Sequence, residues 1–600
     1  MRICFRLSHF LRLATTISIL AIGCSSESQP GDNTTTGGTP PPSGQPDSST
    51  RDGATSDAVP ATDAPADTSR PPTDAAVDTS RPNDVVPDTS RPMDAGVDMN
   101  RVDASVDMAA DMGSPPVTDA TPPPPDLGGS DMGVADTGVR IDSPAPDSGG
   151  PSGDAGCAST LTGVELFRCQ ALTYGRPYEL VEDLVINVGP RLAGTTGFAN
   201  AVTWATAKLT ALGLTNVRTE PVTVPHWERG MEHAELLGPT ETPLAIAALG
   251  GSVGTAAGGV EAEVIEAASV SALNALPNSQ VQGKIAFVNI VMPRAMDASG
   301  YSAVSSARRS GASTAASKGA VAYIVRSLTP AMDNAPHTGG MGNASIPAVA
   351  IGVQDAIRLS NSIQAGATRV RITLGCQTLA NVQTSNVIGE FVGKGAPNQI
   401  LLLGAHLDSW DITPGAHDDG AGVAMVAEAA RLINVYANDT RRTIRVVLYA
   451  NEENGLSGAN AYASAHSSEL ANHVMAYEAD LGGDRVYGAT FRAGSSATTI
   501  IRDLLAPLAP LGVATATAGG GAGADLGPIA SQGVPTAELL QDLTRYFDFH
   551  HAPTDTMAAL DRNQLQQATA ATAVFAYQLA RSDADFGRAN VTLKDEDPEH

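Results

Sequence analysis

The side chains best suited to chemistry are a histidine and several carboxylates in the second half of the chain. His406 and Asp408 form a His-x-Asp pair, Asp418 follows ten residues later, and Glu452 and Glu453 are adjacent. The same region adds one further acid and a late histidine pair: Asp480, His550 and His551. Imidazole and carboxylate groups are ligands of zinc and similar metals. Each motif alone is a weak signal, but together they predict a divalent-metal site.

Most of these side chains follow segments that read as buried strands. Residues 400–404, 444–449 and 474–479 are short apolar runs of the kind that form parallel strands. His406 and the glutamate pair come just after the first two runs, and Asp480 follows the third. Helical apolar spacing separates the first two runs, which indicates an α/β fold. Such sheets bind ligands at the carboxyl ends of their strands, so the candidate ligands are expected to meet there.

Two metal ions a few ångström apart need one shared ligand and a terminal set for each ion. A carboxylate can bridge two ions, whereas an imidazole usually does not. The set offers one bridge, two histidines and two further carboxylates, which leaves Glu452 unligated beside Glu453. An unligated carboxylate next to metal-bound water is what a hydrolase needs as general base. Asp408, two residues past His406, can orient that imidazole without itself binding the metal.

Taken together, the motifs resemble those of the co-catalytic dizinc exopeptidases, which include bacterial leucyl aminopeptidases and glutamate carboxypeptidases. Within that family they are most similar to the carboxypeptidase Q branch. The resemblance runs from about Tyr174 to Leu579, and these stretches carry it: 224–230, 404–411, 418–420, 452–453, 477–480 and 546–557. It implies the zinc exopeptidase fold, a mixed β-sheet flanked by helices, with two Zn²⁺ per chain.

The resemblance also implies individual roles. It names five metal ligands, with Asp418 as the bridge: His406, Asp418, Glu453, Asp480 and His551. Glu452 would take a proton from the metal-bridging water and pass it to the leaving amine, and Asp408 would orient His406. His551 is preferred to His550 because it precedes an Asp-Thr pair by four residues, while His417 and His550 remain alternative ligands. The peptide bond after the bridging Asp418 is implied to be cis.

The implied activity is hydrolysis of dipeptides or of terminal residues of small peptides. An aminopeptidase acting through the same site remains an alternative. A glutaminyl-cyclase-like acyltransferase and a non-catalytic surface receptor are less favoured, because the ligand set is complete. No basic patch suggests a nucleic-acid partner. Side-chain preference stays open, as does a homodimer.

The N-terminus has the layout of an export signal. Arg2, Arg6 and Arg12 flank a short apolar segment that ends at Gly23-Cys24. Residues 1–23 resemble a bacterial lipoprotein signal peptide, in which Cys24 would be acylated and become the new N-terminus; an ordinary signal peptide is the alternative. Ser follows the cysteine where Asp would favour the inner membrane. The prediction is an exported, lipid-anchored protein on the outer membrane or cell surface.

Residues 24–156 differ sharply in composition from the rest of the chain. They lack Phe, Trp, Tyr and Lys, and the repeat Asp-Thr-Ser-Arg-Pro begins at Asp67, Asp78 and Asp88. With 23 acidic and six basic residues, this segment carries most of the formal net charge of −27. It cannot bury enough apolar surface to offset its ordering entropy and is predicted to be a disordered stalk. Calcium binding by its aspartates is a weaker alternative, since the ligand spacing is too wide.

The remaining chain is long enough for two domains. Residues 157–224 and 376–584 are predicted to form a discontinuous zinc peptidase domain, followed by an acidic tail at 585–600. Short strands and Gly-rich turns over 225–375 predict a β-rich insertion, which resembles a protease-associated domain.

Three cysteines lie beyond Cys24. Cys157 and Cys169 are predicted to form a disulfide, which is plausible in an exported protein. Their spacing and the lack of a nearby histidine argue against a zinc site. Cys376 lies apart from both and is interpreted as a buried apolar side chain.

Overall fold

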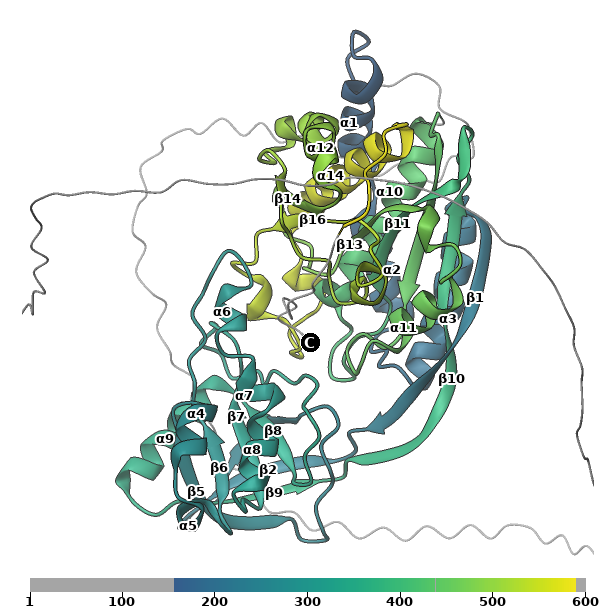
Figure 1. Cartoon of the computed structure of the whole chain (residues 1–600). Coiled ribbons are helices and arrows are strands. Elements are labelled where there is room, and N and C mark those ends of the chain that lie inside the picture. Colours follow the sequence, from purple (N-terminus) through teal and green to yellow (C-terminus); the bar gives the residue numbers. More distant parts are fainter. Residues whose placement is uncertain (1–155, 438, 590–600) are drawn as a thin grey trace, which may run out of the picture. The chain divides into compact units, whose positions relative to one another are not determined.

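The computed structural model describes residues 156–437 and 439–589 (Figure 1). The predicted signal peptide, the lipidation site at Cys24 and the stalk lie outside the described residues, as does most of the acidic tail. Within the two described ranges, no helix combines the length and the apolar character needed to cross a membrane.

The first of two sheets carries the strands that precede the candidate site. Its eight strands run in the order β1-β10-β12-β11-β13-β16-β14-β15. Their bounds are β1 Thr215–Glu228, β10 Gln377–Phe391, β11 Ala396–His406, β12 Arg442–Tyr449, β13 His473–Glu478, β14 Val486–Arg492, β15 Thr517–Ala518 and β16 Thr536–Gln541. The four central strands β12, β11, β13 and β16 are parallel, and their outer neighbours β10 and β14 are antiparallel. Their carboxyl ends therefore meet at one edge of a mixed sheet.

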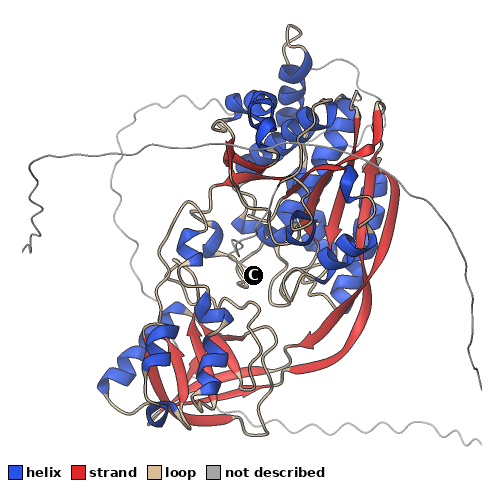
Figure 2. Cartoon of the chain, in the orientation of Figure 1, coloured by secondary structure: helices blue, strands red, loops and turns tan. Residues whose placement is uncertain are grey.

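Helices cover both faces of this sheet (Figure 2). Along β11, Leu401 and Leu403 belong to a large core with the main helices, whereas Leu402 belongs to a smaller core on the opposite face. The large core includes α1 Gly163–Tyr174, α2 Pro177–Asn187, α3 Thr196–Ala211, α10 Gly422–Tyr436, α12 Thr498–Leu505 and α14 Arg562–Arg581. The smaller one includes α11 Ser457–Ala465 and α13 Gly527–Ala530. Burial on both faces explains why these strands read as continuous apolar runs.

The second sheet is built entirely from residues inside the predicted insertion. Its order is β3-β2-β9-β5-β6-β7-β8-β4. The strands are β2 Glu232–Leu237, β3 Thr242–Leu244, β4 Ile246–Ala248, β5 Val260–Ala267, β6 Ile285–Val288, β7 Ala322–Arg326, β8 Ala348–Ile351 and β9 Arg369–Leu374. Six helices accompany them: α4 Val270–Ala275, α5 Asn278–Val281, α6 Ser299–Ser302, α7 Ser306–Arg309, α8 Gly311–Ser317 and α9 Val353–Ala365. The insertion thus holds more helix than its Gly-rich sequence suggested.

The long strands β1 and β10 connect the two sheets (Figure 1). They pair antiparallel from Thr215 opposite Glu390 to Glu228 opposite Gln377. Gly230 lies at the junction with φ +65°, and a Cβ there would collide with the backbone of Gly375. Only glycine allows the two connecting segments to approach this closely.

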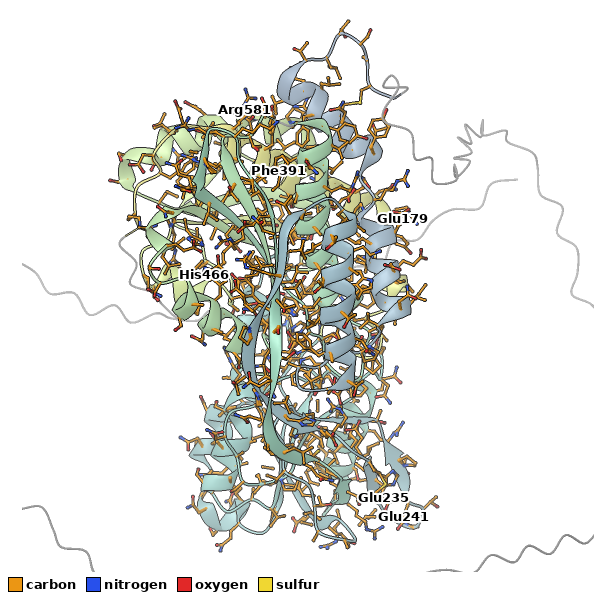
Figure 3. All side chains as sticks on the ribbon, turned by 90° about the vertical axis from the view of Figure 1, so that its right-hand side faces the viewer. Glu179, Glu235, Glu241, Phe391, His466 and Arg581 are labelled. Carbon is orange, nitrogen blue, oxygen red and sulfur yellow. A yellow bond between two sulfur atoms is a disulfide. The ribbon has the colours of Figure 1, made fainter. Side chains whose placement is uncertain are left out.

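Charged side chains pair across neighbouring strands of the second sheet. Arg371 of β9 donates to Glu235, to Glu241 at 3.3 Å and to Glu261 at 3.0 Å. Figure 3 labels Glu235 and Glu241 close together at its lower end. These ion pairs join neighbouring strands through solvated side chains.

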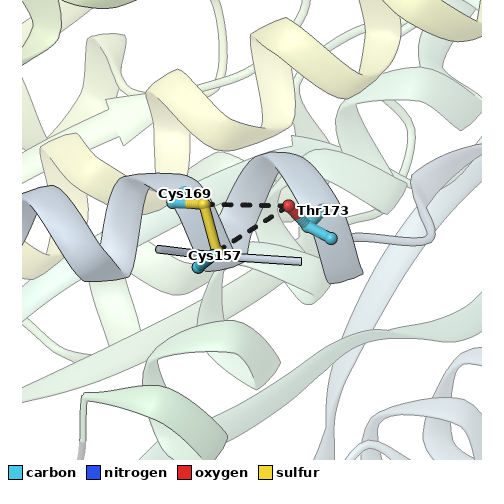
Figure 4. The surroundings of a disulfide bond; sticks show 3 residues. All are labelled: Cys157, Cys169 and Thr173. Carbon is cyan, nitrogen blue, oxygen red and sulfur yellow. Dashed lines mark hydrogen bonds between the residues drawn. A yellow bond between two sulfur atoms is a disulfide. The ribbon is translucent and has the colours of Figure 1, made fainter. Parts of the chain in front are cut away.

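The structure contains a disulfide between Cys157 and Cys169, which ties the start of the described chain to α1 (Figure 4). Thr173 lies one turn further along, with its Oγ1 at 3.9 Å from each sulfur. Cys376 is free and buried.

Candidate active site

The candidate ligands meet at the carboxyl edge of the four parallel strands. His406 is the last residue of β11, Glu452 and Glu453 are three and four residues past β12, and Asp480 is two residues past β13. Asp418 lies in the turn Ala416–Ala421 that precedes α10. All five side chains are buried. The sheet topology therefore gathers residues up to 74 positions apart in the chain.

One group is centred on His406. Its Nε2 lies 3.1 Å from Asp418 Oδ1 and 3.1 Å from Asp480 Oδ1. Its Nδ1 lies 3.1 Å from the backbone oxygen of Asp408, which can only accept a hydrogen bond, so Nδ1 carries the proton. The Asp408 carboxylate is 3.7 Å from the same nitrogen and accepts from the backbone N–H of Glu452 at 3.1 Å. Asp408 therefore fixes the imidazole with Nε2 aimed at two carboxylates.

A second group is centred on His551. Its Nε2 lies 3.0 Å from Glu453 Oε2 and 3.4 Å from Asp418 Oδ2. Its Nδ1 donates to the backbone oxygen of Thr338, in the insertion, at 3.3 Å. Asp418 thus presents one carboxylate oxygen to each histidine. Such an arrangement would allow one carboxylate to be shared between two metal ions.

The buried polar atoms test whether a cation fits here. Asp418 Oδ2 and Glu453 Oε2 are buried, and no group of the described residues donates a hydrogen bond to them. Burial lowers the pKa of His551 well below its ordinary value, so its imidazole is neutral. With the proton on Nδ1, its Nε2 is an acceptor that faces acceptor oxygens. A cation between them would satisfy all three atoms, and nitrogen and oxygen donors suit a divalent metal such as zinc.

The electrostatics around His406 and Glu453 agree with that fit. Burial opposes a charged His406, but Asp480, Asp408 and Asp418 outweigh it and raise the pKa of His406 well above its usual value. Burial and the nearby Asp418 charge raise the pKa of Glu453 well above its usual range. Both shifts reflect negative charge packed into a buried space, which a bound cation would neutralise.

The alternative histidines differ in their surroundings. Both ring nitrogens of His417 are engaged by backbone: Nε2 lies 3.0 Å from the oxygen of Ala559, and Gly483 N–H donates to Nδ1 at 3.1 Å. His417 is therefore unsuited to bind a metal. His550 stacks on His551 with ring centroids 3.6 Å apart, and its Nε2 is 3.9 Å from Asp418 Oδ2. It borders the site at a longer distance than His551.

Asp419 has a structural place despite lying beside His406. Its two oxygens accept from the backbone N–H groups of His406 at 3.1 Å and Gly422 at 3.0 Å. It thereby ties the end of β11 to the start of α10. The Asp418–Asp419 peptide bond is cis.

Two buried residues that support the site were missed from the sequence as functional positions. Asp555 accepts from the backbone N–H groups of His417 at 2.7 Å and Asp418 at 3.1 Å. Arg191 donates through Nε to the oxygen of Leu407 at 2.6 Å and through Nη2 to that of Gly415 at 3.1 Å. Together they hold the loop between the two halves of the candidate site. Neither has a local signal, because their partners are distant in sequence.

A cavity of about 370 Å³ opens beside these groups. Glu452, Glu453 and His551 line it. Its other lining residues are Arg308, Arg309, Gly340, Met341, Gly342, Asn454 and Gly455. Glu452 thus lies next to Glu453 in the chain and, like it, borders open space. The Cys157–Cys169 disulfide lies at α1 and takes no part in this cluster.

Comparison with known proteins places this geometry in context. The profile of Peptidase family M28 matches residues 386–576. Carboxypeptidase Q from Bos taurus is 36% identical over 410 residues, which are 68% of this chain and 85% of the relative. The human protein of that name is 35% identical over 431 residues, 71% of this chain and 90% of the relative.

Solved structures give the same picture. The crystal structure of a Peptidase M28 precursor from Shewanella amazonensis is 38% identical, with a TM-score of 0.70 over 72% of this chain and 98% of that one. BSAP, a zinc aminopeptidase from Bacillus subtilis, is 21% identical with a TM-score of 0.52 over 68% and 97% of the two chains, which shows a shared fold. The predicted fold class and the predicted family resemblance are confirmed.

Proposed function

The chain belongs to peptidase family M28 and is a metallo-exopeptidase; we propose that it is a zinc-dependent exopeptidase that hydrolyses dipeptides or terminal residues of small peptides, a proposal that its likeness to proteins named carboxypeptidase Q supports. The observation that carries this proposal is the pair of groups around His406 and His551 that share Asp418. An aminopeptidase working through the same residues is the alternative.

We assign two zinc ions to the two groups. His406 and Asp480 would complete one position, and His551 and Glu453 the other, with Asp418 common to both. When bound, the metal would polarise the scissile carbonyl and lower the pKa of an attacking water. The chain's own acceptor atoms, which face one another at 3.0 to 3.4 Å, support this assignment.

Glu452 is assigned as general base. It is buried, it borders the cavity, and it lies next to the ligand Glu453 in the chain. From there its carboxylate would accept a proton from the attacking water and later deliver it to the leaving amine. Asp408 supports this arrangement because its carboxylate accepts from Glu452 N–H while its backbone oxygen holds His406.

The decisive experiment measures metal content and turnover in the full-length protein. We expect two zinc ions per chain, cleavage of unblocked dipeptides, and a Glu452→Gln variant that keeps its metal but loses about 100- to 10,000-fold in kcat. Glu179→Gln, an equal charge change at an exposed position, serves as control and should leave kcat unchanged. A Glu452→Gln variant with wild-type kcat would overturn the role of Glu452. A chain that binds no zinc on reconstitution would overturn the ligand set.

We also propose the location and domain limits predicted from the sequence. Residues 1–23 would direct export, Cys24 would carry lipid, and residues 24–156 would hold the enzyme away from an outer-membrane or cell surface. The peptidase domain would comprise 157–224 and 376–584, interrupted by the insertion 225–375. Incorporation of labelled palmitate into the wild type, lost in Cys24→Ser, would test the anchor; equal labelling of both would contradict it.

A further inference from the structure

Two groups of side chains with opposite charge line the cavity beside the candidate metal ligands. Glu452 and Glu453, together with His551, belong to the part of the chain that forms the first sheet. Arg308 and Arg309 lie at the end of α7 in the insertion. A substrate in this cavity would therefore have its scissile bond near the carboxylates and another part of itself against two guanidinium groups.

Arg308 is held in place before any substrate arrives. Its side chain is buried, its Nη2 donates to the hydroxyl of Tyr301, and its guanidinium carbon lies 5.7 Å from the centre of that ring. Gly339 has φ +133°, and a Cβ at this position would overlap the guanidinium of Arg308. A glycine there leaves room for the cation at the cavity. A cation fixed in this way loses little side-chain entropy on binding an anion.

Arg309 is anchored through its backbone and half-buried through its side chain. Its backbone oxygen accepts from Gly342 N–H at 2.8 Å, and its Nη2 donates to Ser305 Oγ at 2.8 Å. No carboxylate among the described residues pairs with Arg309, although most other arginines of the insertion have one. Its guanidinium is thus placed on the cavity with donors to offer an anion.

We propose that Arg308 and Arg309 bind the free α-carboxylate of the substrate's C-terminal residue, so that the site reads the C-terminus. This inference rests on the proposed exopeptidase function. Guanidinium groups match carboxylates in geometry and charge, whereas they repel the ammonium group of a free N-terminus. A cavity of about 370 Å³ is at the small end for ligand sites, which suits one or two residues and favours dipeptides.

A carboxylate could also come from an acidic side chain of the substrate. Both sources offer the same planar anion, so the test separates them with matched peptides. Ala-Ala carries only the α-carboxylate, Ala-Ala amide carries none, and Ala-Glu amide carries only a side-chain carboxylate. We expect Ala-Ala to be cleaved far better than the other two peptides.

The experiment compares kcat/KM for these peptides in the full-length wild type and in Arg309→Gln. We expect amidation of Ala-Ala to cost the wild type about 30- to 300-fold, the usual loss when one partner of a desolvated charge pair is removed. In Arg309→Gln, kcat/KM for Ala-Ala should fall by about 10-fold or more, while kcat/KM for Ala-Ala amide changes little. The ratio of the two values should therefore fall sharply. Arg369→Gln, an exposed arginine of β9, is the matched control and should keep the wild-type ratio.

Three outcomes would overturn the proposal: equal cleavage of acid and amide by the wild type, an unchanged ratio in Arg309→Gln, or a preference for Ala-Glu amide over Ala-Ala. If Arg309→Gln does not fold, Arg308→Lys provides the second variant, because it keeps the charge but loses the planar fork; its ratio should also fall. A wild type that cleaves no peptide would instead refute the proposed function.

A binding measurement tests the role of the two arginines even if the wild type cleaves no peptide. Calorimetric titration of Glu452→Gln with Ala-Ala and its amide reports affinity without turnover. At least about tenfold tighter binding of the acid supports the arginine assignment. Equal affinities would refute it.

Discussion

The two sheets share an architecture but differ in chemistry. Each has four adjacent parallel strands, β12-β11-β13-β16 in the first and β5-β6-β7-β8 in the second. In the first, β11 ends at His406, and acids follow the other three strands within three residues, among them Glu452 and Asp480. In the second, none of the three residues after any of these strands is His, Cys, Asp or Glu. Parallel topology brings strand ends together, but the residues placed there decide whether a site results.

The second sheet nevertheless contributes to the candidate site. Thr338 of the insertion accepts from His551 Nδ1, and Arg308 and Arg309 line the cavity. The first region thus supplies the candidate ligands and the candidate base, and the second supplies cations and a backbone acceptor. A peptidase built in this way can change its substrate range through the insertion and leave the ligand cluster untouched.

The largest effect is expected at the carboxylate common to both groups. Asp418→Asn removes one negative charge from between His406 and His551, so both proposed metal positions lose affinity. We expect the zinc content to fall from two to below one per chain and kcat/KM to fall by more than about 10,000-fold.

The matched comparison for Asp418→Asn is wild-type protein treated with a chelator. It should lose activity to the same extent and recover it on addition of zinc, whereas the variant should not recover. Elemental analysis measures the zinc content, and peptide hydrolysis measures the activity. Full metal content in Asp418→Asn would show that the bridge is misassigned.

Substitutions just after one strand of each sheet test the contrast between the sheets directly. Asp480→Asn alters the residue two positions after β13, and Asn289→Ala alters the residue directly after β6. We expect the first to lose about one zinc per chain and more than about 100-fold in kcat/KM. The second should change kcat/KM less than about twofold, since the Asn289 side chain donates to Glu266 within the insertion and lies outside the candidate site. Similar losses in both variants would mean that the insertion takes part in metal binding.

Weakening the contacts that hold the loop around Asp418 should have an intermediate effect. Asp555 accepts two backbone N–H groups, and Asn in its place has only one oxygen to accept them. We expect Asp555→Asn to lower zinc affinity and kcat/KM by about 10- to 100-fold, the usual range for residues that orient metal ligands. The exposed Asp503 of α12 offers Asp503→Asn as control. An equal loss in the control would point to general charge effects.

The sequence predicted the first region better than the second. The apolar runs 400–404, 444–449 and 474–479 lie within or overlap β11, β12 and β13, because strands buried on both faces must be apolar throughout. In the insertion, α9 was missed although it is 13 residues long, and small residues and glycines elsewhere hid the shorter helices. Intrinsic propensity is a weak guide where packing against a sheet stabilises short helices.

The candidate site shows the same division. His406, Asp480 and the glutamate pair could be singled out because each lies at the carboxyl end of a strand or within four residues of it. Arg191 and Arg309 could not be predicted. The role of an arginine depends on its partners, and the fold brings these together from distant parts of the chain. Arg191 contacts carbonyl groups more than 200 positions away. Local patterns therefore point to candidate ligands at strand ends but not to the arginines around them.

The smallest expected effect concerns stability, and it again contrasts the two sheets. Arg445 of β12 is buried and donates to Glu390 at 2.8 Å, to Tyr462 at 2.9 Å and to Glu469. Arg371 of β9 makes three ion pairs, one more than Arg445, but its side chain is 32% exposed against 8% for Arg445. Removing one partner of a buried network leaves charges uncompensated, whereas exposed pairs are screened.

We therefore expect Arg445→Gln to lower the free energy of unfolding by about 3 kcal/mol, while Arg371→Gln has a much smaller effect. Both variants should keep their zinc and their kcat, because neither residue borders the cavity. Urea denaturation followed by circular dichroism measures the difference. Equal losses would show that exposure does not separate the two networks, and a greater loss in Arg371→Gln would mean that the insertion limits the stability of the whole chain.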